Sequence, residues 1–420
     1  MPYKKIPGTK DILPDEALWW EKIELSARDI FRLYNYQPIR TPIIEEETLF
    51  NRSLGQTSEI VQKQMFLIKN KEDNYALRPE ATVSVVRAYL ENNIDKTSGF
   101  AKFYYMGPMF RFERPQKGRL RQFHHLGCEA IGSTDPSLDI ETIALADDLL
   151  KAFSVFGYKI KINTLGCDKD KAMLAEFLRK RISEKKDLLC QDCSRRLETN
   201  VLRILDCKKT GCRQLVNTLQ LEDFKICAEC QTHFNRVSDG LNSIGIKYEL
   251  SPYLVRGLDY YTRTVFEITH GELGAQDALG AGGRYDNLVK ELGGPAQGAI
   301  GFAFGMERIL LVAKLQDRQT PKNNLVYLIA LGEEAKRGGI KILSELRKNN
   351  IACDTDYENK SLKGALRRAN DIKASSVLIL GEDELKRGII TVKNMLSGEQ
   401  REVKREVLVE ELRSQYAKNP

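Results

Sequence analysis

The segment from Phe103 to Gly132 constrains the fold of this chain more than any other stretch of its 420 residues. Two runs of strand-forming residues flank a loop in which five Lys or Arg residues stand against one Glu. A turn at Gly107-Pro108 should interrupt the first run, and the two-residue period of the second puts every other residue, Glu129 included, on one face. The pattern predicts a long basic hairpin whose strands carry Arg111 and Glu129.

Two interpretations of this hairpin remain open from the residues alone. A charged loop is most often a solvated tip with no ligand. Arg111 and Glu129 lie inside the expected strands, however, where an unpaired charge is costly to bury. Because guanidinium groups suit the geometry of phosphate, the excess of basic residues favours an anionic ligand, with a phosphate as the first candidate.

Length and composition set broad limits. A chain of this length forms two or three domains with full cores, and a net charge of +7 permits a polyanionic partner without requiring one. The sequence holds no run of roughly 18 apolar residues that could span a bilayer, and Met1–Pro14 lacks the apolar core of a secretory signal. We therefore expect a cytoplasmic protein with no membrane contact.

Several segments resemble motifs of one enzyme family. FRFERPQKGRLRQF (Phe110–Phe123) resembles motif 2 of the class II aminoacyl-tRNA synthetases, in the form found in histidyl-tRNA synthetases. RGLDYYTRTVFE (Arg256–Glu267) and ALGAGGRYDNL (Ala278–Leu288) are similar to the two histidine-specific motifs of that family. Ala299–Leu310 resembles motif 3, and the helix and Pro-bearing strand of Pro14–Glu45 resemble motif 1. The resemblance covers nearly the whole chain apart from a cysteine-rich insert.

The resemblance implies an α+β fold. A class II synthetase catalytic domain with an antiparallel sheet is expected over residues 1–322, interrupted by a helical insertion domain at 168–246. A short polar linker at Pro321–Asn324 leads to a C-terminal α/β anticodon-binding domain over 325–420. Alternating strands and helices predict a mixed sheet there, ending with the strand Ile389–Lys393. Motif 1 implies a homodimer.

The family's reaction is the ATP-dependent ligation of L-histidine to tRNA(His) through a histidyl-adenylate, and the matched motifs imply roles for individual residues. Arg111 and Arg256 would be the catalytic pair, flanking the α-phosphate and the histidine carboxylate. ATP with Mg2+ would be bound by Arg111, Glu113, Arg119, Phe123 and Arg308. Histidine would be bound by Glu80, Thr82, His125, Glu129, Tyr260 and Tyr261. The acceptor end of the tRNA would meet Arg114, Gln116 and Arg121.

One residue of the histidine site departs from the family pattern. His125 stands where the family usually has Gln, near the α-amino group of the substrate. A protonated imidazole would repel an ammonium group. We therefore expect weakened activity below about pH 6.5, the unperturbed pKa of histidine.

Three further expectations concern the backbone near the site. Ala81 replaces a Gly of the family, so its turn must form without a left-handed residue. Strand alternation would put Tyr260 and Tyr261 on opposite faces, so that at most one lines a given wall of a pocket. Gly282 and Gly283 would let the backbone approach the substrate closely.

The chain has nine cysteines, which without a secretory signal indicate reduced thiols or a metal site rather than disulfides. Six lie in the insert: Cys190, Cys193, Cys207, Cys212, Cys227 and Cys230. The two CxxC pairs stand further apart than in ordinary zinc motifs. A tetrahedral zinc site could use both pairs, or one pair with Cys207 and Cys212. The alternative is a small helical insert with buried reduced cysteines, and no metal ligand is assigned.

Two other classes of protein share parts of this pattern. The first is the regulatory subunit of ATP phosphoribosyltransferase, a binding module that typically lacks the Arg of the first histidine-specific motif and the C-terminal domain. Arg256 and residues 325–420 are both present here. The second is another class II synthetase, such as a prolyl or threonyl enzyme, and RGLDYYTRTVFE argues against it.

Overall fold

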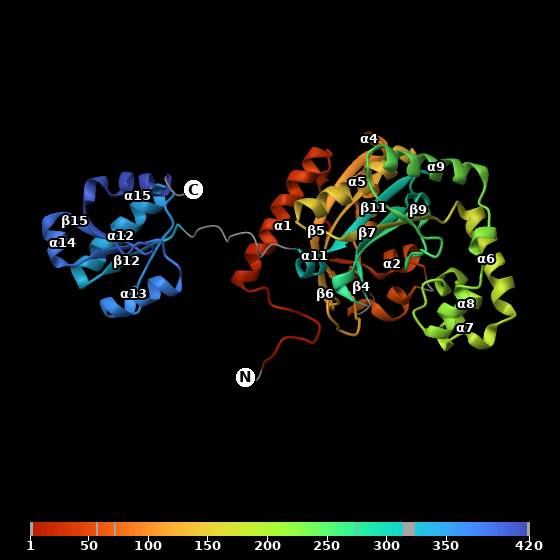
Figure 1. Ribbon diagram of the computed structural model, residues 1–420, viewed down its shortest axis with the longest axis horizontal. Helices are drawn as coiled ribbons and strands as arrows, with labels where there is room; N and C mark the ends of the chain where they lie inside the picture. Colours follow the sequence, from red (N-terminus) through yellow and green to blue (C-terminus); the bar gives the residue numbers. More distant parts are fainter. Residues whose placement is uncertain (1–2, 56–57, 71–72, 275, 314–323, 418–420) are drawn as a thin grey trace. The chain divides into compact units, whose positions relative to one another are not determined.

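The computed structural model describes residues 3–55, 58–70, 73–274, 276–313 and 324–417. Of the linker expected at Pro321–Asn324, only the last residue falls within these ranges, and the rest lies outside the described residues. The chain divides into two compact units, Met1–Leu315 and Gln316–Pro420 (Figure 1). Among the helices described, none is long and apolar enough to cross a membrane.

The first unit is organised around an eight-stranded sheet with the order β1-β5-β6-β11-β10-β9-β7-β8. Its central strands pair antiparallel, and the two-residue edge strands β1 and β8 add in parallel. This mostly antiparallel sheet confirms the expected α+β class. The strands are β1 (Gln37–Pro38), β5 (Ala101–Phe110), β6 (Gln122–Ile131), β7 (Tyr158–Thr164), β8 (Glu249–Leu250), β9 (Thr262–His270), β10 (Ala278–Arg284) and β11 (Ala299–Gly305).

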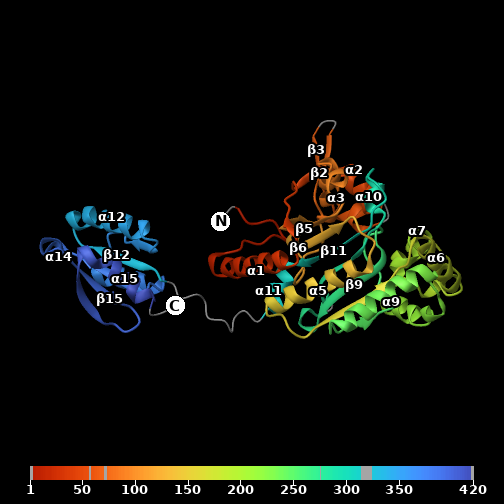
Figure 2. The ribbon, with the colours of Figure 1, turned by 90° about the horizontal axis from the view of Figure 1, so that it is seen from above.

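Helices cover one face of this sheet. Figure 2 shows α1, α5 and α9 along the same side, and their apolar residues form one core with residues of β6, β9 and β11. In β6 the core residues are Leu126, Cys128 and Ala130, so the alternate residues of that strand face the other way. These helices and the short helix that follows β11 are α1 (Pro14–Leu33), α5 (Pro136–Ala152), α9 (Ala228–Ser243) and α11 (Met306–Val312).

The opposite face meets a small three-stranded sheet of order β2-β4-β3 and its helices (Figure 2). Buried residues of α2 and α3 belong to the second core of this unit, together with Tyr105, Ile131 and Val265 of the large sheet. These elements are β2 (Ile44–Glu46), β3 (Phe66–Asn70), β4 (Asp73–Leu77), α2 (Glu47–Ser53), α3 (Thr82–Glu91), α4 (Ile94–Thr97) and α10 (Leu288–Glu291).

The hairpin differs from its prediction in two respects. β5 ends at Phe110, so Arg111 lies just after the strand and not inside it. β5 runs without a break from Ala101 to Phe110 and pairs with β6 throughout, so the turn expected at Gly107-Pro108 is wrong. Arg78 explains the two residues. Its Nε donates to the carbonyl oxygen of Pro108 at 3.0 Å, and a side chain at Gly107 would collide with its guanidinium. The glycine therefore makes room for Arg78 rather than turning the chain.

The insertion leaves the sheet after β7 and returns through α9. Its helices are α6 (Asp168–Ser183), α7 (Gln191–Thr199) and α8 (Thr210–Val216), joined by 3-10 turns at Lys186–Leu188, Val201–Ile204 and Leu221–Asp223. Apolar residues of all three helices extend the second core. The insertion therefore shares an apolar core with the rest of the first unit.

The second unit is a five-stranded mixed sheet of order β13-β12-β14-β15-β16. β12 pairs in parallel with both neighbours, and the remaining pairs are antiparallel. The sequence missed β16 because its residues alternate poorly, with only Val403 buried. The elements are β12 (Val326–Ala330), α12 (Glu333–Lys348), β13 (Cys353–Thr355), α13 (Leu362–Asp371), β14 (Ser376–Leu380), α14 (Glu382–Arg387), β15 (Ile389–Asn394), β16 (Gln400–Lys404) and α15 (Leu408–Ala417).

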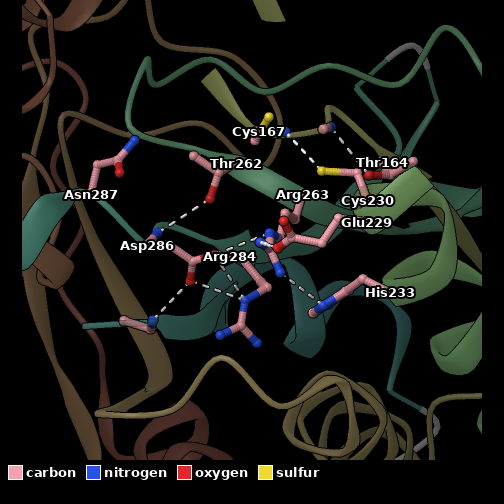
Figure 3. Close-up of polar contacts among 12 residues, drawn as sticks. Thr164, Cys167, Glu229, Cys230, His233, Thr262, Arg263, Arg284, Asp286 and Asn287 are labelled. Carbon is pink, nitrogen blue, oxygen red and sulfur yellow. Dashed lines mark hydrogen bonds and ion pairs between the residues drawn. The ribbon is translucent and has the colours of Figure 1, made fainter. Parts of the chain in front are cut away.

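A buried ion pair joins the end of β10 to α5. The side chains of Arg284 and Asp139 are both 0 % exposed and contact each other directly. Arg284 Nε also donates to Asp286 at 3.0 Å, and Asp139 contacts the His233 ring at 3.1 Å. Figure 3 shows this network continuing through Arg263, which donates to His233 and Glu229 of α9. The start of α9, where the insertion returns, is thereby held to the eight-stranded sheet.

We expect Asp139→Asn to destabilise the first unit by about 3–5 kcal/mol, because it leaves the buried guanidinium of Arg284 without its main counter-charge. Denaturant unfolding followed by tryptophan fluorescence measures this unit alone, since Trp19 and Trp20 are the only tryptophans of the chain. The matched control is Glu249→Gln, which removes a carboxylate from an exposed pair with Lys159 and should leave the midpoint unchanged. Equal midpoints for Asp139→Asn and the wild type would contradict the account.

Candidate active site

A cavity of about 720 Å3 lies on the face of the large sheet that α1, α5 and α9 leave open. Its floor includes Phe123 and His125 of β6 and Gly301 and Ala303 of β11. These residues alternate with the core residues of the same strands, as the two-residue period requires. Its walls include the loop after β5, the loop before α3, the segment before β9, the first turn of α11 and part of the insertion.

Arginines from distant parts of the sequence line this cavity together: Arg111, Arg119, Arg256 and Arg308. Arg256 donates to Glu267 at 2.7 Å, while its buried Nε atom has no partner among the described residues. Arg119 lies 3.2 Å from Glu113. The arginines therefore bring guanidinium groups from distant segments to one place, where an anionic ligand can reach them.

Arg308 fixes the basic loop over the cavity. Its Nε donates to the carbonyl oxygen of Gly118 at 2.9 Å, and its Nη1 donates to that of Ala278 at 2.5 Å. Desolvation, followed by the nearby charge of Arg119, lowers the pKa of Arg308. Carbonyl oxygens thus orient this guanidinium, and its charge remains available to an anion.

The loop before α3 brings Glu80 and Thr82 to the cavity. Both carboxylate oxygens of Glu80 accept backbone N–H groups, from Thr82 at 2.7 Å and from Val83 at 2.9 Å. These bonds satisfy the first turn of α3. Ala81 has φ −108°, so the turn forms without a left-handed residue, as expected. Burial raises the pKa of Glu80.

Glu129 is 1 % exposed and lies beneath the cavity. Three hydroxyl groups donate to its carboxylate: Thr82 at 2.7 Å, Tyr105 at 2.9 Å and Tyr285 at 2.5 Å. Burial raises the pKa of Glu129 to about 8, and the hydrogen bonds from Tyr285 and Thr82 oppose that rise. The group therefore holds its proton in most molecules at neutral pH. A side chain at Gly301, its register partner on β11, would collide with the carboxylate.

Sequence reasoning missed Tyr105 and Tyr285, which line the cavity above Glu129. The register offered a signal for Tyr105, because it pairs across the hairpin with Gly127 and shares a face with Glu129. A side chain at Gly127 would collide with the Tyr105 ring. Tyr285 follows β10 directly, and no pattern in the sequence marks it as a partner of Glu129.

Tyr260 and Tyr261 both line the cavity, and the strand alternation that would put them on opposite faces does not reach them. Their ring centroids lie 4.7 Å apart. Strand alternation does not apply to them, because β9 begins only at Thr262. The segment before the strand is free to turn both rings the same way.

His125 contributes a neutral ring. Its buried Nδ1 atom has no hydrogen-bond partner among the described residues, and its ring meets Phe123 edge-on with centroids 5.1 Å apart. Burial, followed by the charges of Arg111 and Arg78, holds the pKa of His125 well below its usual 6.5. The expected loss of activity below pH 6.5 therefore does not follow from this residue. An unpaired Nδ1 atom can accept a hydrogen bond from a donor group of a ligand.

The residues predicted to meet the acceptor end of the tRNA lie apart from the cavity lining. Of the residues described, those that line it do not include Arg114, Gln116 or Arg121. Gln116 forms a tight turn with Arg119, and Arg121 stacks on Phe112. The close approach of the backbone to the substrate at Gly282 and Gly283 stays a prediction. Side chains at Gly282 and Gly283 would collide with β11 and β9, so these glycines serve strand packing.

The cysteines of the insertion form two groups. One group consists of Cys190, Cys193, Cys207 and Cys212. It matches the alternative in which Cys207 and Cys212 join one CxxC pair. Cys227 and Cys230 lie instead with Cys167 and Asp170. A site built from the two CxxC pairs is therefore wrong.

Two families of known proteins match this chain, one for each of its two compact units. A family model described as histidyl-tRNA synthetase matches residues 8–309, and one described as an anticodon binding domain matches residues 325–415. The histidine–tRNA ligase of Halothermothrix orenii is 45 % identical over 98 % of this chain and 99 % of its own. That of Thermosipho melanesiensis is 45 % identical over 97 % of both chains.

Solved structures agree with these sequence relatives. The apo histidyl-tRNA synthetase of S. aureus superimposes with a TM-score of 0.80 at 34 % identity, covering 98 % of this chain and 100 % of its own. A Bacillus halodurans protein described as an ATP phosphoribosyltransferase regulatory subunit/histidyl-tRNA synthetase has a TM-score of 0.65 at 20 % identity, covering 90 % of this chain and 98 % of its own. At that identity the second likeness concerns the fold alone.

We expect the imidazole of His125 to stay uncharged as the pH is lowered through 6.5, because burial and two arginines oppose its protonation. The chain has four histidines, so 15N NMR of the labelled protein resolves each ring. The His125→Gln variant identifies the signal by its loss, and free imidazole in the same sample serves as the titrating control. A His125 titration midpoint at or above 6.5 would contradict the assignment.

Proposed function

This chain belongs to the histidyl-tRNA synthetase family and ligates histidine to tRNA(His), and from that premise we propose how its cavity performs the reaction. The histidine carboxylate attacks the α-phosphorus of ATP, giving histidyl-adenylate and pyrophosphate. Both reactants are anionic, so the site must offset their repulsion before it can align them. The observation that carries the proposal is the meeting of four arginines in one cavity beside a buried carboxyl group.

Arg111 and Arg256 are the proposed catalytic residues. They enter the cavity from different walls, one after β5 and the other before β9. Arg111 is oriented by a hydrogen bond to the carbonyl oxygen of Pro79 at 2.9 Å, and Arg256 by Glu267. Guanidinium groups on two sides of the α-phosphate would stabilise the charge that develops on it in the transition state.

The remaining basic residues form the proposed ATP subsite. Arg119 and Arg308 would hold the β- and γ-phosphates, Phe123 would stack on adenine, and Glu113 would accept a hydrogen bond from its amino group. The guanidinium carbon of Arg111 lies 5.3 Å from the centroid of the Phe123 ring, which leaves the adenine close to the reacting phosphate. Mg2+ would be held mainly by phosphate oxygens, with Glu113 or Glu267 as nearby carboxylates.

The neutral end of the cavity is the proposed histidine pocket. Glu80, Thr82 and His125 offer acceptors to the α-ammonium group, and the ring of Tyr260 walls that side. Glu129 and Tyr261 would meet the two ring nitrogens. An imidazole N–H would take the place of one of the three hydroxyls that now donate to Glu129. An apolar side chain would leave these buried groups unpaired, which discriminates more strongly than shape does.

Acceptor-end contacts are proposed for Arg114, Gln116 and Arg121. They belong to the basic loop but lie outside the cavity lining, where a bound macromolecule rather than ATP would reach them. Because tRNA is a cytoplasmic molecule in bacteria, we propose that this protein is cytoplasmic as well.

A homodimer is proposed through α1 and the segment after it. The outer face of α1 exposes large apolar residues, with Leu18 at 45 %, Leu25 at 58 % and Leu33 at 71 %, and Ile44 adds 52 %. Large apolar side chains left exposed along one helix in this way suit a protein interface. Sedimentation velocity should give about twice the chain mass of 47.8 kDa for the wild type and the chain mass for Leu25→Glu/Leu33→Glu. A monomeric wild type at micromolar concentration would contradict it.

In histidine-dependent ATP–pyrophosphate exchange, we expect Arg256→Ala to lower kcat about 100- to 1,000-fold, because it removes a charge that acts mainly in the transition state. The matched control is Arg236→Ala on α9, which removes an arginine with a 58 % exposed side chain away from the cavity, and it should keep the wild-type rate. Proline or threonine should support no exchange. A rate for Arg256→Ala near that of the wild type would overturn its role.

A further inference from the structure

Four cysteines of the insertion converge although they come from separate segments. Cys190 immediately precedes α7 and Cys193 lies in its first turn, while Cys207 lies in the loop before α8 and Cys212 in the first turn of that helix. The four sulfur atoms all lie within 4.8 Å of one another. All four residues are free thiols.

The spacing of the sulfur atoms fits one tetrahedral metal ion. Thiolates bound to zinc at about 2.3 Å stand roughly 3.8 Å apart, and the Sγ atoms of Cys190 and Cys207 lie 3.9 Å apart. A disulfide would need sulfur atoms about 2.05 Å apart. An iron–sulfur cluster would spread its thiolates around several iron atoms. The geometry therefore favours a single ion.

The surroundings of the sulfur atoms suit thiolates. The backbone N–H of Cys190 donates to Sγ of Cys212 at 3.2 Å, as outer-shell donors do around metal-bound sulfur. Cys193 and Cys212 are 0 % and 1 % exposed. Lys208 and Lys209 follow Cys207 in the sequence, and their positive charges would offset the net negative charge of four thiolates on zinc.

We propose that Cys190, Cys193, Cys207 and Cys212 bind one zinc ion that fixes the α7–α8 part of the insertion. This part spans about 40 residues, a length at which a small unit usually needs a metal, disulfides or a partner to hold its shape. It also forms one wall of the cavity, through Cys190, Arg196, Cys207 and Lys209 among others. Zinc would thereby hold a basic segment in place opposite the loop after β5.

The second cysteine group serves as an internal control. There the Asp170 carboxylate already accepts two backbone N–H groups, from Cys227 at 2.8 Å and from Cys167 at 3.2 Å. Cys167 also donates its N–H to Sγ of Cys230, as Figure 3 shows. This group offers three thiols and one carboxylate whose two oxygens already accept backbone N–H groups, so it is the weaker candidate for zinc. Its cysteines therefore give matched substitutions that should not change the zinc content.

The test is elemental analysis of the full chain, purified without added metal. We expect about one zinc per chain in the wild type and in Cys227→Ser/Cys230→Ser, and less than about one tenth of that in Cys193→Ser/Cys212→Ser. Trypsin should cut the region between Lys185 and Lys225 faster in the zinc-free variant. Iron in place of zinc, or zinc lost only from Cys227→Ser/Cys230→Ser, would overturn the proposal.

A second measurement covers the case in which the double variant fails to fold. Zinc is removed from the wild type with a thiol-reactive mercurial and a chelator, the thiols are regenerated, and Co2+ is titrated into the native protein. Four thiolates should give sulfur-to-cobalt charge-transfer bands and the d–d bands of a tetrahedral ion at one equivalent. Cobalt bound without charge-transfer bands, or no binding, would contradict the site.

Discussion

The active site of this enzyme depends on the carboxyl group of Glu129, whose pKa is raised by burial. Glu129 lies under the cavity floor, and the three hydroxyls that reach it come from α3, from β5 and from the segment after β10. Gly301 on the neighbouring strand leaves the space that the carboxyl occupies. Residues scattered over about half of the chain therefore converge on one titratable group, which makes the pocket specific for a ligand that can hydrogen-bond to it.

The cavity separates two electrostatic environments. One end holds Arg111, Arg119, Arg256 and Arg308, and the other lies above Glu129 and holds a neutral His125. This division matches the substrates, because ATP and the histidine carboxylate carry the negative charge while the imidazole is uncharged at neutral pH. Preorganised charges of this kind act without further rearrangement when the transition state forms.

The sequence anticipated the parts of the structure that local patterns encode. The central antiparallel strands, the mixed C-terminal sheet and the arginines of the motifs follow from periodicity and family resemblance. The errors arise where distant residues decide. The strand is continuous at Gly107-Pro108, where a break was expected, because Arg78 packs against these residues. Tyr260 and Tyr261 lie before the strand whose alternation was applied to them. For the cysteines the sequence left two groupings open, and helix packing selects the one in which Cys207 and Cys212 join the first CxxC pair. The buried pair of Arg284 and Asp139 joins elements 145 residues apart, which no local pattern reveals.

Histidine binding measured by calorimetry between pH 6.5 and 8.5 tests the central role of Glu129 most directly. Since its pKa of about 8 keeps much of the free carboxyl protonated at lower pH, and the ionised carboxylate is the stronger acceptor for an imidazole N–H, affinity should rise with pH and level off above about 8. Glu129→Gln should bind histidine about 10- to 100-fold more weakly at pH 8.5 and lose that rise. Equal affinity and an identical pH dependence in both proteins would contradict the account.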